Sequence, residues 1–129
     1  MSSDARWLDN LDRANRELTS FLATPIIDAR DRAGIIQAFE FTLELFWKTM
    51  QKLAPAHSLS ATTPRAALQV GLRLGLIPLA HEETWARMLR DRNLTSHTYN
   101  ESLAVEICQR IAADYQPRFH ETLVAMHAL

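Results

Sequence analysis

Hydrophobic residues recur along this chain mostly at intervals of three and four, the spacing of one face of an α-helix. The first run ends before Pro25, and the second extends from near Asp28 or Asp31 to about Ala54. In the second run apolar side chains leave little of the helix circumference polar, which is typical of a helix packed on several sides. We therefore expect two long helices, of which the second is central.

Turn and capping residues divide the remainder of the chain. Thr63 followed by Pro64 predicts the start of a short third helix, which Gly75 can close. Pro78 separates that helix from a fourth. A last apolar stripe continues to the C-terminus, with a kink or a restart expected at Pro117.

These elements indicate an all-α fold without a strand pattern or an internal repeat. The prediction is an antiparallel four-helix up-and-down bundle with one additional short helix, forming a single domain over residues 1–129. Hydrophobic residues make up 47% of the chain and only 3 residues are glycine, which favours a compact helical protein. The length is sufficient to bury a core without disulfides or a metal ion.

The stripe of the fourth helix is interrupted by a cation. Trp85, Met88 and Leu89 lie on one face, and the same period then reaches Arg92 and Ser96. A charge at an apolar position is costly unless another group pairs with it. We therefore expect Arg92 at an interface, in a cleft or in a salt bridge.

His97 follows Arg92 by five residues, and its imidazole is the side chain best suited to exchange a proton near neutral pH. On an unbroken helix the two residues would point about 140° apart, because each residue advances by about 100°. Thr98 and Glu101 have the spacing of a capping box, which predicts a new helix from about Thr98. A bend before that helix would let Arg92 and His97 face a common point.

Acidic side chains on the second helix offer a partner for the cation. Glu40, Glu44 and Lys48 step by four along one line, and Glu44 precedes Lys48 in the favourable orientation for an ion pair. One interpretation is a surface pair that contributes a few tenths of a kcal/mol, roughly. The alternative is that one of the two carboxylates contacts Arg92 and holds it in place.

Charge and composition limit the possible partners. The formal net charge is −1, so any contact with RNA or a nucleotide requires a local positive patch. The chain shows no secretion signal and no apolar run of the roughly 18 residues that span a membrane, and its one cysteine excludes an internal disulfide. We expect a cytoplasmic protein. No metal site or other cofactor is predicted, because the five histidines are scattered and no Cys-x-x-Cys or His-Glu-x-x-His is present.

An arginine, a histidine and a hydroxyl in one cleft suit cleavage of an RNA backbone. His97 could take the proton of a ribose 2′-hydroxyl while Arg92 stabilises charge on the phosphoryl oxygens. A two-fold dimer would supply a second histidine as the acid, and Arg87 and Arg90 could add positive charge. The residues alone also permit another interpretation, in which Arg92 forms a salt bridge, His97 caps a helix and Tyr99 is a core aromatic residue.

Several blocks resemble one family in content and order. They are Arg6-Trp7, the residues from Gln37 to Thr49, Pro64-Arg65, and Asp91 to Tyr99 with the pattern Arg92-x4-His97-x-Tyr99. Together they resemble the HEPN superfamily, in particular its HepT-like members, also described as nucleotidyltransferase substrate-binding proteins.

The resemblance implies a homodimer that works with a small nucleotidyltransferase-fold partner. Some HepT-like proteins are metal-independent endoribonuclease toxins whose motif Arg and His, here Arg92 and His97, cut RNA. In these the motif tyrosine, here Tyr99, is the hydroxyl that the antitoxin modifies with AMP (AMPylation). The polar residue after the arginine, here Asn93, is typical of the motif.

The resemblance also leaves an alternative in a different class. Under it the chain is the non-catalytic substrate-binding subunit of a two-component nucleotidyltransferase. The chain cannot itself transfer nucleotides, since it lacks the Gly-Ser and Asp-x-Asp pattern of that enzyme class. Both interpretations predict a dimer and a nucleotidyltransferase partner, and they differ in the role of His97.

Overall fold

The computed structural model describes the backbone of residues 2–97 and 100–129, and the side chains of residues 6–95 and 100–129. In chain order its elements are α1 (Ser2–Leu22), α2 (Ala29–Leu53), the 3₁₀ turn η1 (Pro55–His57), α3 (Pro64–Arg73), the 3₁₀ turn η2 (Leu79–His81), α4 (Glu82–His97), α5 (Glu101–Arg110), the π-helix η3 (Ile111–Tyr115) and α6 (Gln116–His127). The predicted all-α fold is confirmed.

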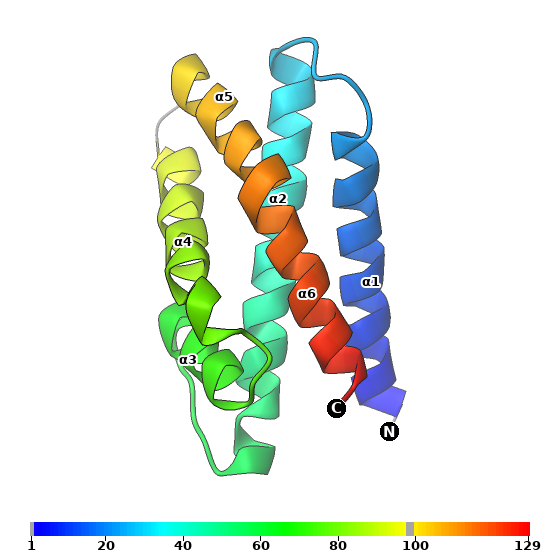
Figure 1. Cartoon of the computed structure of the whole chain (residues 1–129), viewed down its shortest axis with the longest axis vertical. Helices are drawn as coiled ribbons and strands as arrows, with labels where there is room; N and C mark the ends of the chain where they lie inside the picture. The colour runs from blue at the N-terminus through cyan, green and yellow to red at the C-terminus, as the bar shows by residue number, and fades with distance from the viewer. Residues whose placement is uncertain (1, 98–99) are drawn as a thin grey trace.

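Four rods run up and down along the long axis of the molecule (Figure 1). Three are α1, α2 and α4, and the fourth is formed by α5, η3 and α6, which continue into one another. The short α3 packs against α2 and α4. α2 contacts α1, α3, α4 and α5, so it is the central helix that its apolar circumference predicts.

Local sequence explains where the central helix begins. Asp28 is the N-cap of α2: its side chain accepts the backbone N–H of Asp31, and the Asp31 side chain accepts the N–H of Asp28 in return.

The core between α2, α4 and the last rod contains stacked and edge-on aromatic rings. Their centroids are 5.0–6.1 Å apart, and they belong to Phe39, Phe46, Trp85, Tyr115 and Phe119.

The contact between α2 and α3 depends on a glycine. A Cβ atom at Gly71 would lie 2.9 Å from both Ile77 Cδ1 and Met50 Sδ, so only glycine allows this approach without a shift of those side chains. α3 ends at Arg73, and Gly75 follows with a φ of 74°, the left-handed conformation expected after a helix.

The predicted boundary between α4 and α5 is wrong in one respect. α4 continues through His97, so no bend separates Arg92 from His97. Asn100 is the N-cap of α5, because its Oδ1 accepts the backbone N–H of Leu103 at 3.0 Å. The expected cap Thr98 lies outside the described residues.

The restart predicted at Pro117 is found: α6 begins at Gln116 with Pro117 in its first turn, although the rod continues through η3 without a gap. Proline has no N–H, so the carbonyl of Ala113 has no backbone donor four residues later. The chain widens into the π-helix η3, in which the Gln116 N–H donates to the Ile111 carbonyl, and Pro117 then lies in the first turn of α6. None of the described helices is both long and apolar enough to cross a membrane.

Candidate functional site

An open pocket of about 350 Å³ lies where α2, α4 and the start of α3 meet. It is lined by Glu44, Trp47, Pro64, Arg65, Leu89, Arg90, Arg92 and Asn93. Arg92 is partly buried, whereas Arg65, Arg90 and Asn93 are less covered. Arg92 therefore lies in a cleft, one of the surroundings that its position on the stripe predicted.

The apolar stripe of α4 passes beside Arg92. Trp85, Met88 and Asp91 are 1%, 0% and 2% exposed, so the buried face continues to Asp91. Leu89 and Arg92 lie at the edge of that face and line the pocket. The sequence pattern placed Arg92 on this stripe; in the structure Arg92 is partly buried, like Leu89, and Asp91 takes the fully buried position three residues after Met88.

The two acidic residues of α2 make different contacts. Glu40 contacts α4 through Thr95, whose Oγ1 donates to Glu40 Oε2 at 2.7 Å and to the Arg92 carbonyl at 2.9 Å. Glu44 lines the pocket with Arg92, and its Oε1 lies 2.6 Å from Lys48 Nζ. The surface pair of Glu44 and Lys48 is confirmed, and a carboxylate contact to Arg92 stays a prediction.

His97 is the last residue of α4, and its backbone is helical. The Cα atoms of Arg92 and His97 therefore lie about 140° apart around one helix axis. The side chains of Ser96 and His97, and the whole of Tyr99, lie outside the described residues. Their predicted roles are untested.

The buried carboxylate of Asp91 holds α4 against the last rod. It accepts Arg110 Nη1 at 2.8 Å and the hydroxyl of Tyr115. Arg87 donates from Nε to the Tyr115 hydroxyl at 3.0 Å and pairs with Asp114 at 2.6 Å. Burial, together with the hydrogen bond donated to Asp91, raises the pKa of Tyr115 well above its ordinary value.

This network changes which arginines belong to the site. Arg87 was a candidate for the basic patch, but it contacts Tyr115 and Asp114 and is absent from the lining of the pocket. Arg90 does line the pocket and forms an exposed pair with Glu83 at 2.7 Å. The sequence signal for Asp91 was its spacing of three from Met88, which places it on the buried face.

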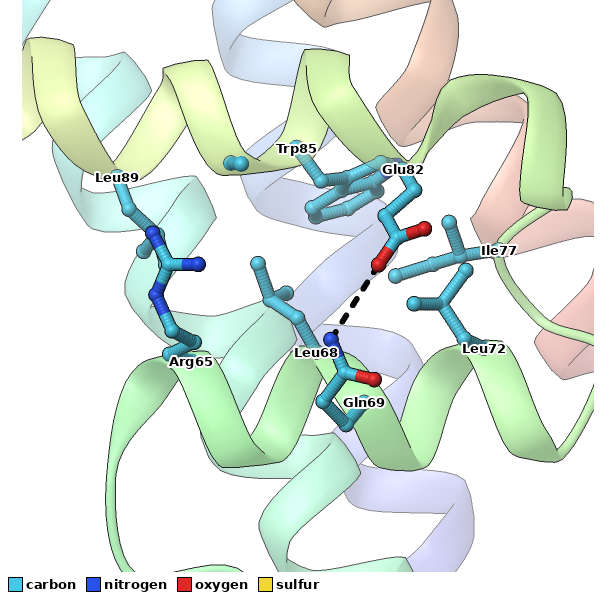
Figure 2. A pocket seen from close by; sticks show the side chains of 9 residues that line it. Arg65, Leu68, Gln69, Leu72, Ile77, Glu82, Trp85 and Leu89 are labelled. Atoms are coloured by element: carbon cyan, nitrogen blue, oxygen red, sulfur yellow. Dashed lines mark hydrogen bonds between the residues drawn. The ribbon is translucent and has the colours of Figure 1, made fainter.

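Arg65 is a cation of the pocket to which the sequence pattern gave no role. It is exposed at the second position of α3, and its guanidinium makes no salt bridge or hydrogen bond within the described part of the chain. The hydrogen bond and charge of Arg90 are the main causes of a lowered pKa at Glu83, and the charge of Arg65 adds to them. Figure 2 shows its side chain extending from α3 toward Leu89 of α4. Both residues also line a neighbouring pocket, where Gln69 Nε2 lies 3.5 Å from Glu82 Oε2.

The described residues offer little support for a metal site or for a reactive cysteine. No group of three or more potential metal ligands occurs among them. Cys108 is 2% exposed, burial raises the pKa of its thiol, and its Sγ lies 3.7 Å from the Arg32 carbonyl. A buried thiol with a raised pKa is a poor nucleophile.

Comparison with known proteins gives one family and a solved structure. Residues 6–128 match the model of a family described as nucleotidyltransferase substrate binding protein like. A protein from Thermus thermophilus, known from its crystal structure, superposes with a TM-score of 0.81 at 30% sequence identity, over 90% of this chain and 98% of that one. No curated protein matches the sequence.

Proposed function

This chain belongs to the family of nucleotidyltransferase substrate-binding-like proteins, and on that premise we propose that it is the helical subunit of a two-component module that cuts RNA without a metal ion. The observation that carries the proposal is the position of Arg92, in a solvent-reachable pocket with two further guanidinium groups, on the helix that ends at His97. Positive charge and an imidazole on one helix are the groups that metal-free scission of a phosphodiester needs.

In the proposed reaction His97 removes the proton of a ribose 2′-hydroxyl. The 2′-oxygen attacks the adjacent phosphorus, the bond from phosphorus to the 5′-oxygen breaks, and a 2′,3′-cyclic phosphate forms. Arg92 stabilises the charge that develops on the non-bridging oxygens. A second imidazole, from another copy of the chain, gives its proton to the leaving 5′-oxygen.

The continuous helix favours the use of a second copy in this reaction. Because Arg92 and His97 lie about 140° apart around α4, one chain presents them on different faces. A two-fold homodimer would place the His97 of one copy opposite the Arg92 of the other. Phe41 on α2 and Leu94 on α4 are 59% and 48% exposed, and exposed apolar side chains on these two helices favour contact with a second copy.

The ribonuclease proposal is tested with purified protein, varied RNAs and a chelator. His97→Ala and Arg92→Gln should each lower the cleavage rate at least about 100-fold, the usual range for a general base or a charge-stabilising group. His120→Ala, which changes an exposed histidine on α6, should cleave like wild type. If the wild-type protein leaves all RNAs intact, the chain is not a ribonuclease.

Control by the partner is a second part of the proposal. We expect the nucleotidyltransferase to transfer AMP from ATP to the hydroxyl of Tyr99 and so to silence cleavage. Mass spectrometry after incubation with the partner and ATP should find the added AMP on Tyr99, and Tyr99→Phe should remain active. Modification at another residue, or none, argues against this form of control.

The family description favours one other function, a non-catalytic subunit that presents a substrate to the nucleotidyltransferase. In that case transfer by the partner requires this chain, and His97→Ala leaves the transfer rate unchanged. Measurement of both activities with the same variant therefore separates the two functions.

A further inference from the structure

We propose that the pocket between α2, α3 and α4 binds a single unpaired nucleotide, with its base on the indole of Trp47 and its phosphate on Arg65 and the start of α3. The inference rests on the proposed function only in taking RNA as the natural source of that nucleotide. Trp47 has no role in the scission chemistry described above, and Arg65 enters it only as one of the positive charges near Arg92.

The charges around the pocket favour an anion. Three guanidinium groups and one carboxylate line it, and the carboxylate, Glu44, pairs with Lys48 at 2.6 Å. Arg90 pairs with Glu83, but those side chains are 53% and 80% exposed. An exposed pair of this kind is weak, so Arg90 can readily exchange Glu83 for another anion. With these two outer partners included, and with Arg92 left out of the sum, the charge of Arg65 still gives the site an excess of positive charge.

The start of α3 adds to this potential. Thr63 is its N-cap and accepts the Ala66 N–H at 3.0 Å, so Pro64 and Arg65 form the first helical turn, and both line the pocket. The N-terminal end of a helix carries partial positive charge and commonly binds phosphate. The guanidinium of Arg65, which forms no salt bridge or side-chain hydrogen bond among the described residues, lies at the same place and is a second donor for that phosphate.

Trp47 supplies the surface for a base. Its side chain is partly buried, which restricts the ring, and it lines the same pocket as the three arginines. Lys48 Nζ lies 5.8 Å from the centroid of the ring, near the outer limit of a cation–π contact. Bases stack on aromatic side chains irrespective of their sequence, so the site would accept any unpaired nucleotide.

Size and charge exclude the neighbouring pocket from this role. The space between Gln69, Glu82 and Trp85 is about 30 Å³, and the Gln69 amide lies across it from Glu82 (Figure 2). That volume holds about one water molecule. The pocket of about 350 Å³ is in the range of small-ligand sites.

Binding is measured by fluorescence anisotropy with a labelled, single-stranded 2′-O-methyl oligoadenylate, which the proposed reaction cannot cleave. Arg65→Gln should weaken binding about 10-fold and lower the salt dependence by about one phosphate contact. Trp47→Leu should weaken binding about 10-fold at unchanged salt dependence, and Trp47→Phe should restore most of it.

Matched controls make the same chemical changes elsewhere. Arg73→Gln removes an exposed arginine at the other end of α3, and Trp7→Leu removes a partly buried indole on α1; both should bind like wild type. Circular dichroism should find equal helix content in all variants. The inference is overturned if Arg65→Gln and Trp47→Leu bind the probe as tightly as their controls.

Further arms identify the source of the nucleotide and separate this inference from the proposed function. If calorimetry finds that free AMP binds and that this binding requires Arg65 and Trp47, whereas the oligonucleotide does not bind, a free nucleotide is the ligand and not RNA. Loss of binding in both variants of a protein that cleaves no RNA supports the nucleotide site and refutes the ribonuclease. If instead the protein cleaves RNA and both variants bind the probe like wild type, the ribonuclease is supported and the nucleotide site is refuted.

Discussion

At the scale of residues, Asp91 and Arg92 are neighbours in sequence with different surroundings. Asp91 is buried and accepts hydrogen bonds from Arg110 and Tyr115, whereas Arg92 lines an open pocket. An ionised carboxylate in a core is tolerated when charged and polar groups surround it in this way. The network thus holds in place the turn of α4 from which Arg92 projects.

The buried hydroxyl of Tyr115 predicts a loss of stability in alkali. Because its pKa is raised in the folded protein above the ordinary value of 10.0, the unfolded chain loses this proton first as the pH rises. Its contribution is fully present below about pH 10 and decreases above it, by up to about 1.4 kcal/mol per pH unit. Urea unfolding at about pH 9 and about pH 11 should therefore give wild type a larger loss of stability than Tyr115→Phe, by about 1 kcal/mol.

Wild type and Tyr115→Phe share Tyr99 and all lysines and arginines. The effect of those groups on the change in stability therefore cancels when the two proteins are compared. Equal losses in the two proteins would mean that Tyr115 ionises as readily in the folded state as in the unfolded state.

At the scale of elements, the periodic helices were predictable and their junctions only in part. The apolar circumference of α2, the Thr63-Pro64 start of α3 and the glycine after it are local signals, and the structure confirms them. The end of α4 was not predictable from its neighbours, because Asn100 competed with Thr98 as a cap. Local rules give both residues a similar preference.

The candidate site, like the helix junctions, was predictable only in part. Arg92 and Asn93 were assigned from the sequence and line the pocket. Asp91 was overlooked because its partners, Arg110 and Tyr115, lie on a different rod, and no local pattern contains them. Trp47 and Arg65 were not joined to the site because they come from α2 and α3 and meet only in three dimensions.

Two helical glycines give opposite predictions. No atom lies within 4 Å of a Cβ built at Gly34 in α2, so Gly34→Ala should stabilise the protein by about 0.5–1 kcal/mol through helix propensity alone. The same change at Gly71 places a methyl group 2.9 Å from Ile77 and Met50, and the overlap, about 1–3 kcal/mol, should exceed that gain. Urea midpoints of the two variants should move in opposite directions from that of wild type.

At the scale of the whole molecule, the proposed chemistry depends on two copies. Leu94 and Phe41 are exposed apolar side chains on α4 and α2, the two helices joined by the hydrogen bond between Thr95 and Glu40, and exposed apolar groups gain free energy when a second copy covers them. A dimer formed through Leu94 would bring the ends of the two α4 helices together.

A charge at this face should weaken the dimer. Leu94→Glu would set two carboxylates near the two-fold axis, where their repulsion and desolvation oppose association. Sedimentation equilibrium should then find the variant mainly monomeric at concentrations where wild type is dimeric, and cleavage of RNA should fall with the dimer fraction. Val124→Glu, at a 57% exposed position on α6, should remain dimeric. A monomeric wild type would remove the shared active site from consideration.

The burial of Cys108 gives the chain a practical property. Because this single native thiol is shielded and held beside the backbone of α2, a cysteine introduced on the surface would react with a maleimide spin label far faster. Each protomer would then carry one paramagnetic centre, and pulsed electron resonance could measure the separation between two copies while every original residue of the core stays in place.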